Sequence, residues 1–249
     1  MQTFAEKNVV VLGAGRGLGA MIAQRAAAEG ARTLAVARGS QRSNGSARTL
    51  DGVDLIELDA ASEAAPEQVL AALEPSLLVI CGGARVHAAP IHELSWDQFS
   101  GSWETDVKMS FLFCKAALEK PLAPGSIVVL VSSGAALGGS PISGGYAAAK
   151  RTQMFIANYC QKESDRLGLG IRFIALVPAM IMPGTERGSD AVAAYAKYLG
   201  IPVSDFLQSM KSPQTPEDVV DALFEIASRP DEWDGNLFKI SSEGLERIQ

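Results

Sequence analysis

Short runs of β-branched and aliphatic residues alternate along this chain with longer segments of helical periodicity. The pattern predicts strands at Asn8–Leu12, Arg32–Ala37, Asp54–Leu58, Leu77–Cys81, Ser126–Val131, Ile171–Val177 and Asn236–Ile240. It predicts helices at about 17–29, 66–73, 95–120, 145–167 and 216–228. Such alternation is typical of a parallel sheet, because each parallel strand needs a crossover to reach the next. We therefore predict an α/β fold with one doubly wound parallel sheet of about seven strands and helices on both faces.

The chain reads as a single domain over residues 1–249. No stretch is rich enough in Pro, Gly or Ser to act as a linker, and no solenoid-type repeat is present. Two segments break the rhythm: the polar stretch Arg38–Gly52 and the long excursion Pro183–Pro213. Long excursions in compact α/β domains are usually lids or binding loops, so we expect a lid or substrate loop over about 183–213.

Charge and composition exclude several classes of protein. The formal net charge of −6 has the wrong sign for a protein that binds a phosphate backbone, so we expect no nucleic-acid partner. No stretch approaches the ~18 apolar residues of a membrane span, so we expect no membrane association. Cys81, Cys114 and Cys160 are too few and too scattered for a disulfide framework or a metal site. We expect a cytoplasmic protein without a metal ion.

A glycine-rich turn follows the first predicted strand and opens the first predicted helix. It reads Gly13-Ala14-Gly15-Arg16-Gly17-Leu18-Gly19. Leu18 breaks the GxGxxG spacing counted from Gly13, whereas Gly13, Gly17 and Gly19 satisfy GxxxGxG. Glycines let the backbone approach a pyrophosphate closely, and the helix N-terminus offers unpaired N–H groups. The alternative is a tight turn without a ligand, and the two flanking elements favour the phosphate site.

The end of the second strand indicates which dinucleotide is bound. A nicotinamide dinucleotide that lacks the 2′-phosphate is normally held by an acidic residue at this point. The strand here ends Val36-Ala37-Arg38, and no acid occurs from Ala31 to Leu50. Arg38, together with Arg16 in the glycine turn, suits a phosphate dianion. We therefore favour NADP(H) over NAD(H), although either arginine alone is equally compatible with a solvated surface charge.

Tyr146 and Lys150 open the helix after strand five and share one of its faces. An ammonium group beside a phenol favours the phenolate, so such a tyrosine can exchange a proton near the working pH. Ser133 stands at the carboxyl end of strand five and can reach the same substrate oxygen. A tyrosine and a lysine at this spacing are a weak pattern alone, but the glycine turn strengthens it.

The order of the glycine turn, Ser133, Tyr146 and Lys150 resembles the short-chain dehydrogenase/reductase family, and the resemblance extends from about residue 8 to residue 240. Cys81-Gly82-Gly83-Ala84 stands where that family has an Asn-Asn-Ala-Gly turn, and Pro178-Ala179 stands where it has Pro-Gly. The resemblance implies a Rossmann-type fold. It also implies a homodimer or homotetramer formed through the helices at 95–120 and 145–167.

The resemblance assigns a role to each matching residue. Tyr146 would be the general acid–base, Ser133 would orient the carbonyl, and Lys150 would bind the nicotinamide ribose and lower the pKa of the tyrosine. Hydride would pass between the cofactor and a small-molecule carbonyl or secondary alcohol. Residues implied in cofactor binding are Gly13, Gly15, Arg16, Gly17, Leu18, Gly19, Arg38, Asp59, Gly82, Gly83, Tyr146, Lys150, Pro178 and Ile181.

The chain departs from the family pattern at several positions. Asp106 stands where the family has an Asn that helps to hold a water next to the lysine, so we include Asp106 in the catalytic set. A carboxylate there would raise the pKa of the lysine-assisted group if its side chain takes part. Pro183 stands where a Thr often contacts the nicotinamide, and Thr185 comes two places later.

Two functional hypotheses follow. The first is an NADP(H)-dependent oxidoreductase for a small, mainly apolar carbonyl compound or secondary alcohol, since the lid segment carries apolar residues such as Met180, Tyr195 and Phe206. These side chains are equally compatible with packing of two small helices. The second hypothesis is a cofactor-binding scaffold or regulator with little catalysis, which Asp106 and the unusual Cys81–Ala84 turn suggest. The complete Ser–Tyr–Lys set favours the enzyme.

Overall fold

A single sheet of eight strands forms the centre of the protein, and the computed structural model describes residues 4–39, 51–210 and 213–248. The strands occur in the order β3-β2-β1-β4-β5-β6-β7-β8. They are β1 (Asn8–Leu12), β2 (Arg32–Ala37), β3 (Val53–Glu57), β4 (Leu77–Ile80), β5 (Ile127–Val131), β6 (Arg172–Pro178), β7 (Leu237–Ser241) and β8 (Gly244–Arg247). All neighbouring pairs from β3 to β7 are parallel, and β8 pairs antiparallel with β7.

The helices connect these strands and cover the sheet. The α-helices are α1 (Gly17–Ala28), α2 (Ala65–Ala72), α3 (Trp96–Ser102), α4 (Lys108–Glu119), α5 (Ala135–Gly138), α6 (Gly144–Leu167), α7 (Glu186–Leu199), α8 (Val203–Ser209) and α9 (Pro216–Ser228). Short 3-10 turns are η2 (Ile91–Glu93) and η4 (Pro230–Glu232), and the segment η3 (Trp103–Val107) is a π-helix. The predicted helix at 95–120 is therefore continuous but changes its winding where α3 passes into α4.

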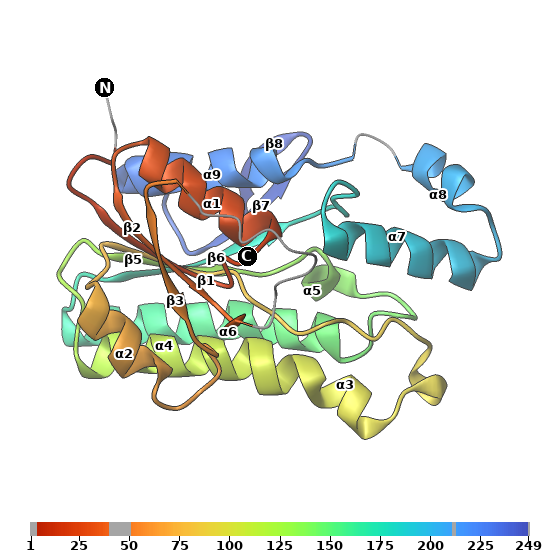
Figure 1. Ribbon diagram of the computed structural model, residues 1–249, viewed down its shortest axis with the longest axis horizontal. Coiled ribbons are helices and arrows are strands. Elements are labelled where there is room, and N and C mark those ends of the chain that lie inside the picture. Colours follow the sequence, from red (N-terminus) through yellow and green to blue (C-terminus); the bar gives the residue numbers. More distant parts are fainter. Residues whose placement is uncertain (1–3, 40–50, 211–212, 249) are drawn as a thin grey trace.

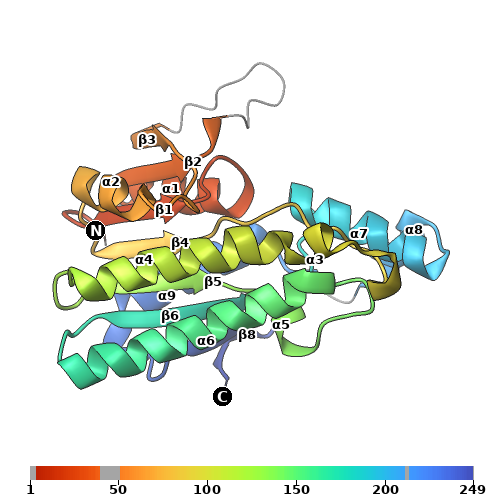
Figure 2. The same cartoon turned by 90° about the horizontal axis from the view of Figure 1, so that it is seen from below.

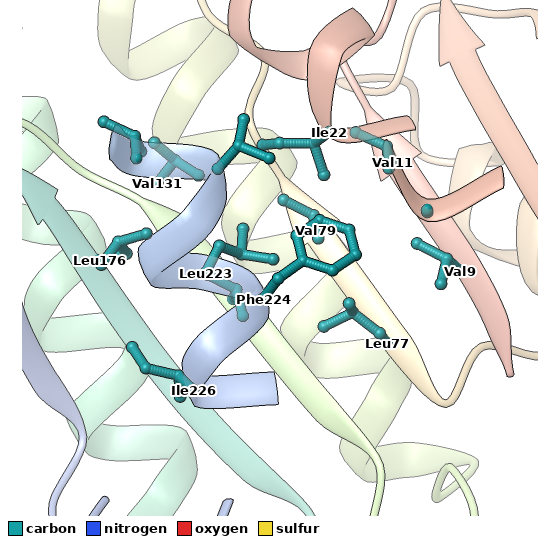
Figure 3. Close-up of a cluster of buried hydrophobic side chains, with 14 of the residues drawn as sticks. Val9, Val11, Ile22, Leu77, Val79, Val131, Leu176, Leu223, Phe224 and Ile226 are labelled. Atoms are coloured by element: carbon teal, nitrogen blue, oxygen red, sulfur yellow. The ribbon is translucent and has the colours of Figure 1, made fainter. Parts of the chain in front are cut away.

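Helices lie on both faces of the sheet, as Figures 1 and 2 show. Helices α1 and α9 cover one face, and α4 and α6 run side by side across the other. Successive residues of a strand point to opposite faces, so β1 contributes to two separate cores. Val9 and Val11 pack with Ile22 of α1 and Phe224 of α9 (Figure 3), whereas Leu12 packs with residues of the opposite layer. This double burial explains why the strands are continuous apolar runs.

The predicted doubly wound sheet and its seven strands are confirmed, and one strand was missed. β8 is a short run of Gly, Leu, Glu and Arg on the edge of the sheet. Lys239 of β7 forms an ion pair with Glu246 of β8, and Arg247 lies 2.7 Å from Asp234. Charged side chains are common on edge strands, where they discourage pairing with another chain. The charged residues of β8 discourage pairing with another chain, and they also leave the strand without the apolar pattern that predicts strands from sequence.

The excursion over 183–213 contains two helices. α7 and α8 project beyond the carboxyl end of the sheet (Figure 1), and the rings of Tyr195 and Phe206 stack with their centroids 5.6 Å apart to join them. Thr185 caps α7, since its Oγ1 accepts a hydrogen bond of 2.9 Å from the backbone N–H of Gly188. Positions 211–212 of this excursion, and positions 40–50 of the predicted polar stretch, lie outside the described residues.

No helix in the three described ranges is long and apolar enough to cross a membrane.

Candidate active site

The order of the strands directs attention to one end of the sheet. β1 lies between β2 and β4: the chain continues from β1 outward to β2 and β3, and then crosses back to β4 on the other side of β1. In open α/β sheets, ligands bind at such a switch point, outside the carboxyl ends of the strands. The turns that follow β1 and β4 meet there, because a Cβ atom built on Gly13 would lie 2.3 Å from Cα of Gly82.

Each glycine of the GxxxGxG spacing has a local reason to lack a side chain. Gly13 and Gly17 have positive φ angles of 77° and 55°, which glycine adopts without strain. A Cβ on Gly19 would lie 2.5 Å from the carbonyl oxygen of Gly13, and a Cβ on Gly15 would lie 3.1 Å from Cβ of Ala37. Leu18 instead packs against the apolar core.

The N-terminus of α1 has no side-chain cap. Its N-cap residue, Arg16, is extended and makes no capping hydrogen bond with its side chain. A Cβ atom added to Gly17 would meet no atom within 4 Å, so open space lies beside the first turn. The uncapped N–H groups and this space fit a phosphate group, which a helix N-terminus attracts through its partial positive charge.

Arg16 and Arg38 lie on segments that border this turn. Arg38 directly follows β2 and is exposed. Arg16 makes a two-oxygen contact with Glu186 at the start of α7, with distances of 2.7 and 2.6 Å from Nη1 to the two carboxylate oxygens. A carboxylate also approaches the end of β2, since a Cβ atom on Gly39 would lie 2.5 Å from Oε2 of Glu57. Glu57 is the last residue of β3, so it lies outside the acid-free stretch from Ala31 to Leu50 that follows from the sequence around β2.

Asp59 and the segment after β6 complete the predicted outer parts of the site. Asp59 is exposed, and its Oδ1 accepts a hydrogen bond of 3.0 Å from the backbone N–H of Ala61. The carbonyl of Pro178 accepts a hydrogen bond of 2.6 Å from the N–H of Gly134. A Cβ on Gly134 would lie 2.2 Å from the carbonyl oxygen of Ala179, so this glycine lets the turn after β5 approach β6. Ile181, three residues after Pro178, is partly buried.

Asp106 is fully buried in the π-helical segment η3. A π-helix adds a residue to the helical repeat and often occurs at functional sites. Oδ1 of Asp106 accepts a hydrogen bond of 2.8 Å from the backbone N–H of Ala84, in the turn after β4. Oδ2 accepts no hydrogen bond from any described residue. The same oxygen explains the glycine at position 83, because a Cβ on Gly83 would lie 2.7 Å from Oδ2 of Asp106.

Lys150 is held by oxygen atoms of the protein. Its Nζ atom lies 3.3 Å from Oδ2 of Asp106, and it donates hydrogen bonds of 3.0 Å to the carbonyl of Val131 and 2.8 Å to Oε1 of Gln153. Gln153 in turn donates a hydrogen bond of 2.7 Å to Oγ of Ser110. The ammonium group is therefore fixed by two layers of polar partners, and only 4% of the residue is exposed.

Tyr146 and Ser133 lie at the edge of this buried network. Nζ of Lys150 is 5.8 Å from the centroid of the Tyr146 ring, one turn earlier on α6. Tyr146 is partly exposed, as is Ser133, which lies two residues after the end of β5. Oγ of Ser133 accepts a hydrogen bond of 3.3 Å from the N–H of Ala135. Ser133 and Tyr146 are thus partly accessible at the carboxyl end of the sheet, whereas Lys150 is buried.

Arg187 also belongs to this constellation, and the sequence analysis missed it. Nη2 of Arg187 donates a hydrogen bond of 3.1 Å to the carbonyl of Ala84, and its Cζ lies 5.5 Å from the centroid of the Tyr146 ring. The residue is exposed overall, yet burial of the guanidinium opposes its charge. Tyr146 and Asp106 outweigh that burial and raise the pKa of Arg187, so it remains a cation. In the sequence near Arg187, the capping residue Thr185 indicates that a helix begins there. It does not indicate which way the Arg187 side chain points.

The Cys81 thiol is neutral at physiological pH. Burial raises its pKa to about 11, although the charges of Lys150 and Arg187 act in the opposite direction. His87 and His92 are exposed on the segment that follows the β4 turn, and Nε2 of His92 lies 3.7 Å from the carboxylate of Glu93. Neither histidine has a described contact with Tyr146 or Lys150.

The chain is similar to known dehydrogenases and reductases in both sequence and structure. The family model of the short chain dehydrogenases matches residues 7–193. A 3beta-hydroxysteroid dehydrogenase of Mediterraneibacter gnavus is 28% identical over 204 residues, which cover 76% of this chain and 71% of that protein. An L-xylulose reductase of Bos taurus is 26% identical over 231 residues, or 90% of each chain.

Solved structures share the fold at lower sequence identity. A sorbitol-6-phosphate 2-dehydrogenase from Erwinia amylovora has a TM-score of 0.78 at 21% identity, covering 92% of this chain and 95% of its own. A short-chain dehydrogenase/reductase from Brucella melitensis, described as a glucose/ribitol dehydrogenase, has a TM-score of 0.77 at 21% identity and covers 96% of each chain. The family model spans most of the sequence, and the glycine turn, Ser133, Tyr146 and Lys150 stand at the carboxyl end of the sheet. The chain belongs to the short-chain dehydrogenase/reductase family.

Proposed function

We propose that this protein is an NADP(H)-dependent oxidoreductase that interconverts a small carbonyl compound and the corresponding secondary alcohol, with Tyr146 as general acid–base. The observation that carries the proposal is the position of the Tyr146 ring 5.8 Å from the buried Lys150 ammonium, at the same end of the sheet as the glycine turn. Members of this family are oxidoreductases that bind a nicotinamide cofactor.

The residues at the switch point fit a dinucleotide. The uncapped N-terminus of α1 and the space beside Gly17 suit a pyrophosphate. Gly82 and Gly83 line the turn after β4, where a Cβ on Gly13 would lie 2.3 Å from Cα of Gly82 and a Cβ on Gly83 would lie 2.7 Å from Oδ2 of Asp106. Asp59 and the Pro178–Ile181 segment would border the two ends of such a ligand. The bound nicotinamide supplies or accepts the hydride.

The choice of NADP(H) depends on charge at the end of β2. Arg38 is exposed there and can form charge-assisted hydrogen bonds with a 2′-phosphate. Arg16 can join it only if its contact with Glu186 is exchanged, and that exposed ion pair is worth little in free energy. The carboxylate of Glu57 near Gly39 favours NAD(H) instead. We retain NADP(H) because Arg38 follows β2 directly.

In this mechanism the protein positions the substrate and moves a proton. The Ser133 hydroxyl donates a hydrogen bond to the carbonyl oxygen, and the Tyr146 hydroxyl donates the proton that this oxygen receives on reduction. In the oxidative direction Tyr146 takes the same proton from the alcohol. Lys150 stabilises the tyrosinate that forms, and its fixed contacts with Val131, Gln153 and Asp106 mean that little reorganisation is needed when the charge appears.

The lid supports a mainly apolar substrate of modest size. Met180 and Leu207 are 38% and 40% exposed, and the rings of Tyr195 in α7 and Phe206 in α8 stack on each other. The hydroxyl of Tyr195 donates a hydrogen bond of 2.7 Å to Oγ of Ser140, which connects α7 to the segment before α6. The names of the two curated relatives, a hydroxysteroid dehydrogenase and a xylulose reductase, differ widely in substrate polarity and do not select between apolar and polar compounds.

We also propose a homo-oligomer. An exposed aromatic surface on the outer face of α4 and α6 consists of Phe111, Phe155 and Tyr159, which are 54%, 46% and 62% exposed. The Phe155 and Tyr159 rings stack with centroids 5.9 Å apart. Contiguous apolar patches on a monomer commonly mark an interface, and a second copy of this face offers a matching surface for a dimer or tetramer.

A cofactor-binding scaffold with little catalysis is the second candidate. It is favoured by the engagement of Lys150 with three protein oxygens, which leaves it 4% exposed. Oxidation of NADPH by members of a carbonyl panel, compared between wild type and Tyr146→Phe, separates the two functions. Activity that is lost in the variant supports the enzyme, whereas cofactor binding without turnover of any carbonyl supports the scaffold.

A further inference from the structure

The carboxylate of Asp106 offsets most of the electrostatic effect that the charge of Lys150 would otherwise have on Tyr146. The two charged atoms lie 3.3 Å apart, and both residues are buried. At the distance of the Tyr146 ring, an ion pair acts as a dipole rather than as a full positive charge, so its field falls off steeply. Stabilisation of a tyrosinate by Lys150 is correspondingly weaker in this chain than it would be beside a neutral residue at position 106.

Arg187 places a second cation beside the same ring. Its Cζ atom is 5.5 Å from the Tyr146 centroid, and Nζ of Lys150 is 5.8 Å from that centroid. None of the salt bridges in residues 4–39, 51–210 and 213–248 involves Arg187. Unlike Lys150, Arg187 is therefore not directly paired with a carboxylate, although Asp106 acts on its charge at longer range.

Two contacts hold Arg187 in this position. Its own Nη2 donates to the carbonyl of Ala84 at 3.1 Å, and the preceding residue, Glu186, binds Arg16 of the glycine turn. The first turn of α7 is thus attached to the turn after β4 and to the turn after β1. A Cβ built on Gly83 would lie 2.7 Å from Oδ2 of Asp106 and 3.0 Å from Nη2 of Arg187, so carboxylate and guanidinium approach the same point.

We propose that Arg187 is a positioning residue that supplies, from the lid, the net positive charge that stabilises the tyrosinate form of Tyr146. The positive charge of Arg187 would then compensate for the negative charge that Asp106 introduces where the family has an Asn. This inference rests on the proposed acid–base role of Tyr146, and it assigns to α7 a part in the chemistry besides enclosing a substrate.

Other ionisable groups around Tyr146 do not supply this charge. The Cys81 thiol is neutral at physiological pH, because burial raises its pKa to about 11. The remaining titratable residues on the neighbouring α3, η3 and the segment after β4 are exposed, namely Arg85, His87, His92, Glu93, Asp97 and Glu104. Exposed charges are screened by water and salt, so they act on Tyr146 less than the buried Lys150 and Asp106 do, and less than Arg187, whose guanidinium group is itself desolvated.

Titration of the cofactor-free protein tests the inference without turnover. The absorbance of tyrosinate is followed against pH, and the curve of Tyr146→Phe is subtracted to isolate Tyr146 from the other three tyrosines. We expect Arg187→Gln to move the midpoint for Tyr146 upward by about one pH unit or more, since an opposite charge within ~4–6 Å has an effect of that size. Arg187→Lys keeps a positive charge at this position, so its midpoint should lie close to that of wild type. Arg229→Gln, which removes an exposed arginine directly after the C-terminus of α9, should leave the midpoint unchanged.

The compensation predicts a specific double-variant result. Asp106→Asn releases the charge of Lys150 and should move the midpoint downward, and Arg187→Gln in that background should return it close to the wild-type value. A midpoint that is unchanged in Arg187→Gln would overturn the proposal. So would a downward shift in that variant, or an absence of any shift in Asp106→Asn.

The pH profile of alcohol oxidation separates this proposal from the proposed function. If both hold, activity in Arg187→Gln rises at a higher pH than in wild type. If Tyr146→Phe abolishes activity while the profile of Arg187→Gln matches wild type, the acid–base role stands and the role of Arg187 fails. If Tyr146→Phe retains full activity, the proposed function fails, whatever the tyrosinate titration gives.

Discussion

The Nζ atom of Lys150 lies 3.3 Å from Oδ2 of Asp106, and both side chains are buried at the boundary between α6 and the π-helical segment η3. A buried ion pair of this kind stabilises a protein little compared with an apolar pair, but removing one partner leaves an uncompensated charge. The pair therefore links the integrity of the site to the stability of the fold.

Removal of the Asp106 carboxylate should destabilise the protein. We expect Asp106→Ala to lower the free energy of unfolding by about 3 kcal/mol, because it leaves Lys150 without its counter-ion and the N–H of Ala84 without an acceptor. Asp106→Asn also removes the counter-ion of Lys150, but it should cost less, since an amide oxygen still accepts the hydrogen bond from Ala84. Urea unfolding followed by circular dichroism measures both, and equal losses in the two variants would contradict this account.

Tyr146→Phe should remove the general acid while preserving the fold. We expect turnover with any carbonyl substrate to fall by at least roughly a hundredfold, as a positioned general acid contributes about 10²–10⁴. The matched control is Tyr159→Phe, the same substitution on the same helix at a residue that is 62% exposed. Equal activity in the two variants would place the proton transfer elsewhere.

Much of this site follows from local patterns. The strands are continuous apolar runs because both faces of the sheet are buried, and glycines at positions 13, 17 and 19 are required by backbone geometry. Tyr146 and Lys150 are one helical turn apart, so their common face could be predicted from spacing alone. These features depend on neighbours in the sequence or on the period of one element.

Features that depend on distant contacts could not be predicted in this way. The contact of Arg187 with Ala84 joins residues 103 positions apart, and that of Arg16 with Glu186 joins residues 170 positions apart. The carboxylate of Glu57 reaches Gly39 from the neighbouring strand β3, although a search along β2 itself finds no acid. The edge strand β8 was missed because only one of its four residues, Leu245, is a large apolar residue.

The exposed aromatic surface of α4 and α6 should control assembly. Phe155→Glu places a charge in the centre of the stacked Phe155–Tyr159 pair, and we expect the protein to become monomeric. Leu199→Glu is the control, as Leu199 is an exposed apolar residue at the end of α7. Light scattering coupled to gel filtration gives the mass of each variant. A wild-type protein that already runs as a monomer would exclude this interface.

The Cys81 thiol should react slowly below alkaline pH. Its pKa is raised to about 11 by burial, and only the thiolate is alkylated, so labelling should rise as the pH passes through about 11 instead of the ordinary value near 9. Iodoacetamide modification quantified by peptide mass spectrometry gives the profile, with the urea-unfolded chain as the reference. Labelling of Cys81 at pH 8 as fast as in the unfolded chain would show that the thiol is neither buried nor neutral.

Parallel fluorescence titrations with NADPH and NADH test most directly whether the protein binds NADP(H) at the switch point of the sheet. We expect NADPH to bind at least about tenfold more tightly than NADH, since a charge-assisted hydrogen bond to the 2′-phosphate contributes ~1.5–3 kcal/mol. Arg38→Ala should remove this preference, whereas Arg32→Ala at the opposite end of β2 should leave it intact. Equal affinity for the two nucleotides would contradict the choice of NADP(H), and binding of neither would contradict the oxidoreductase.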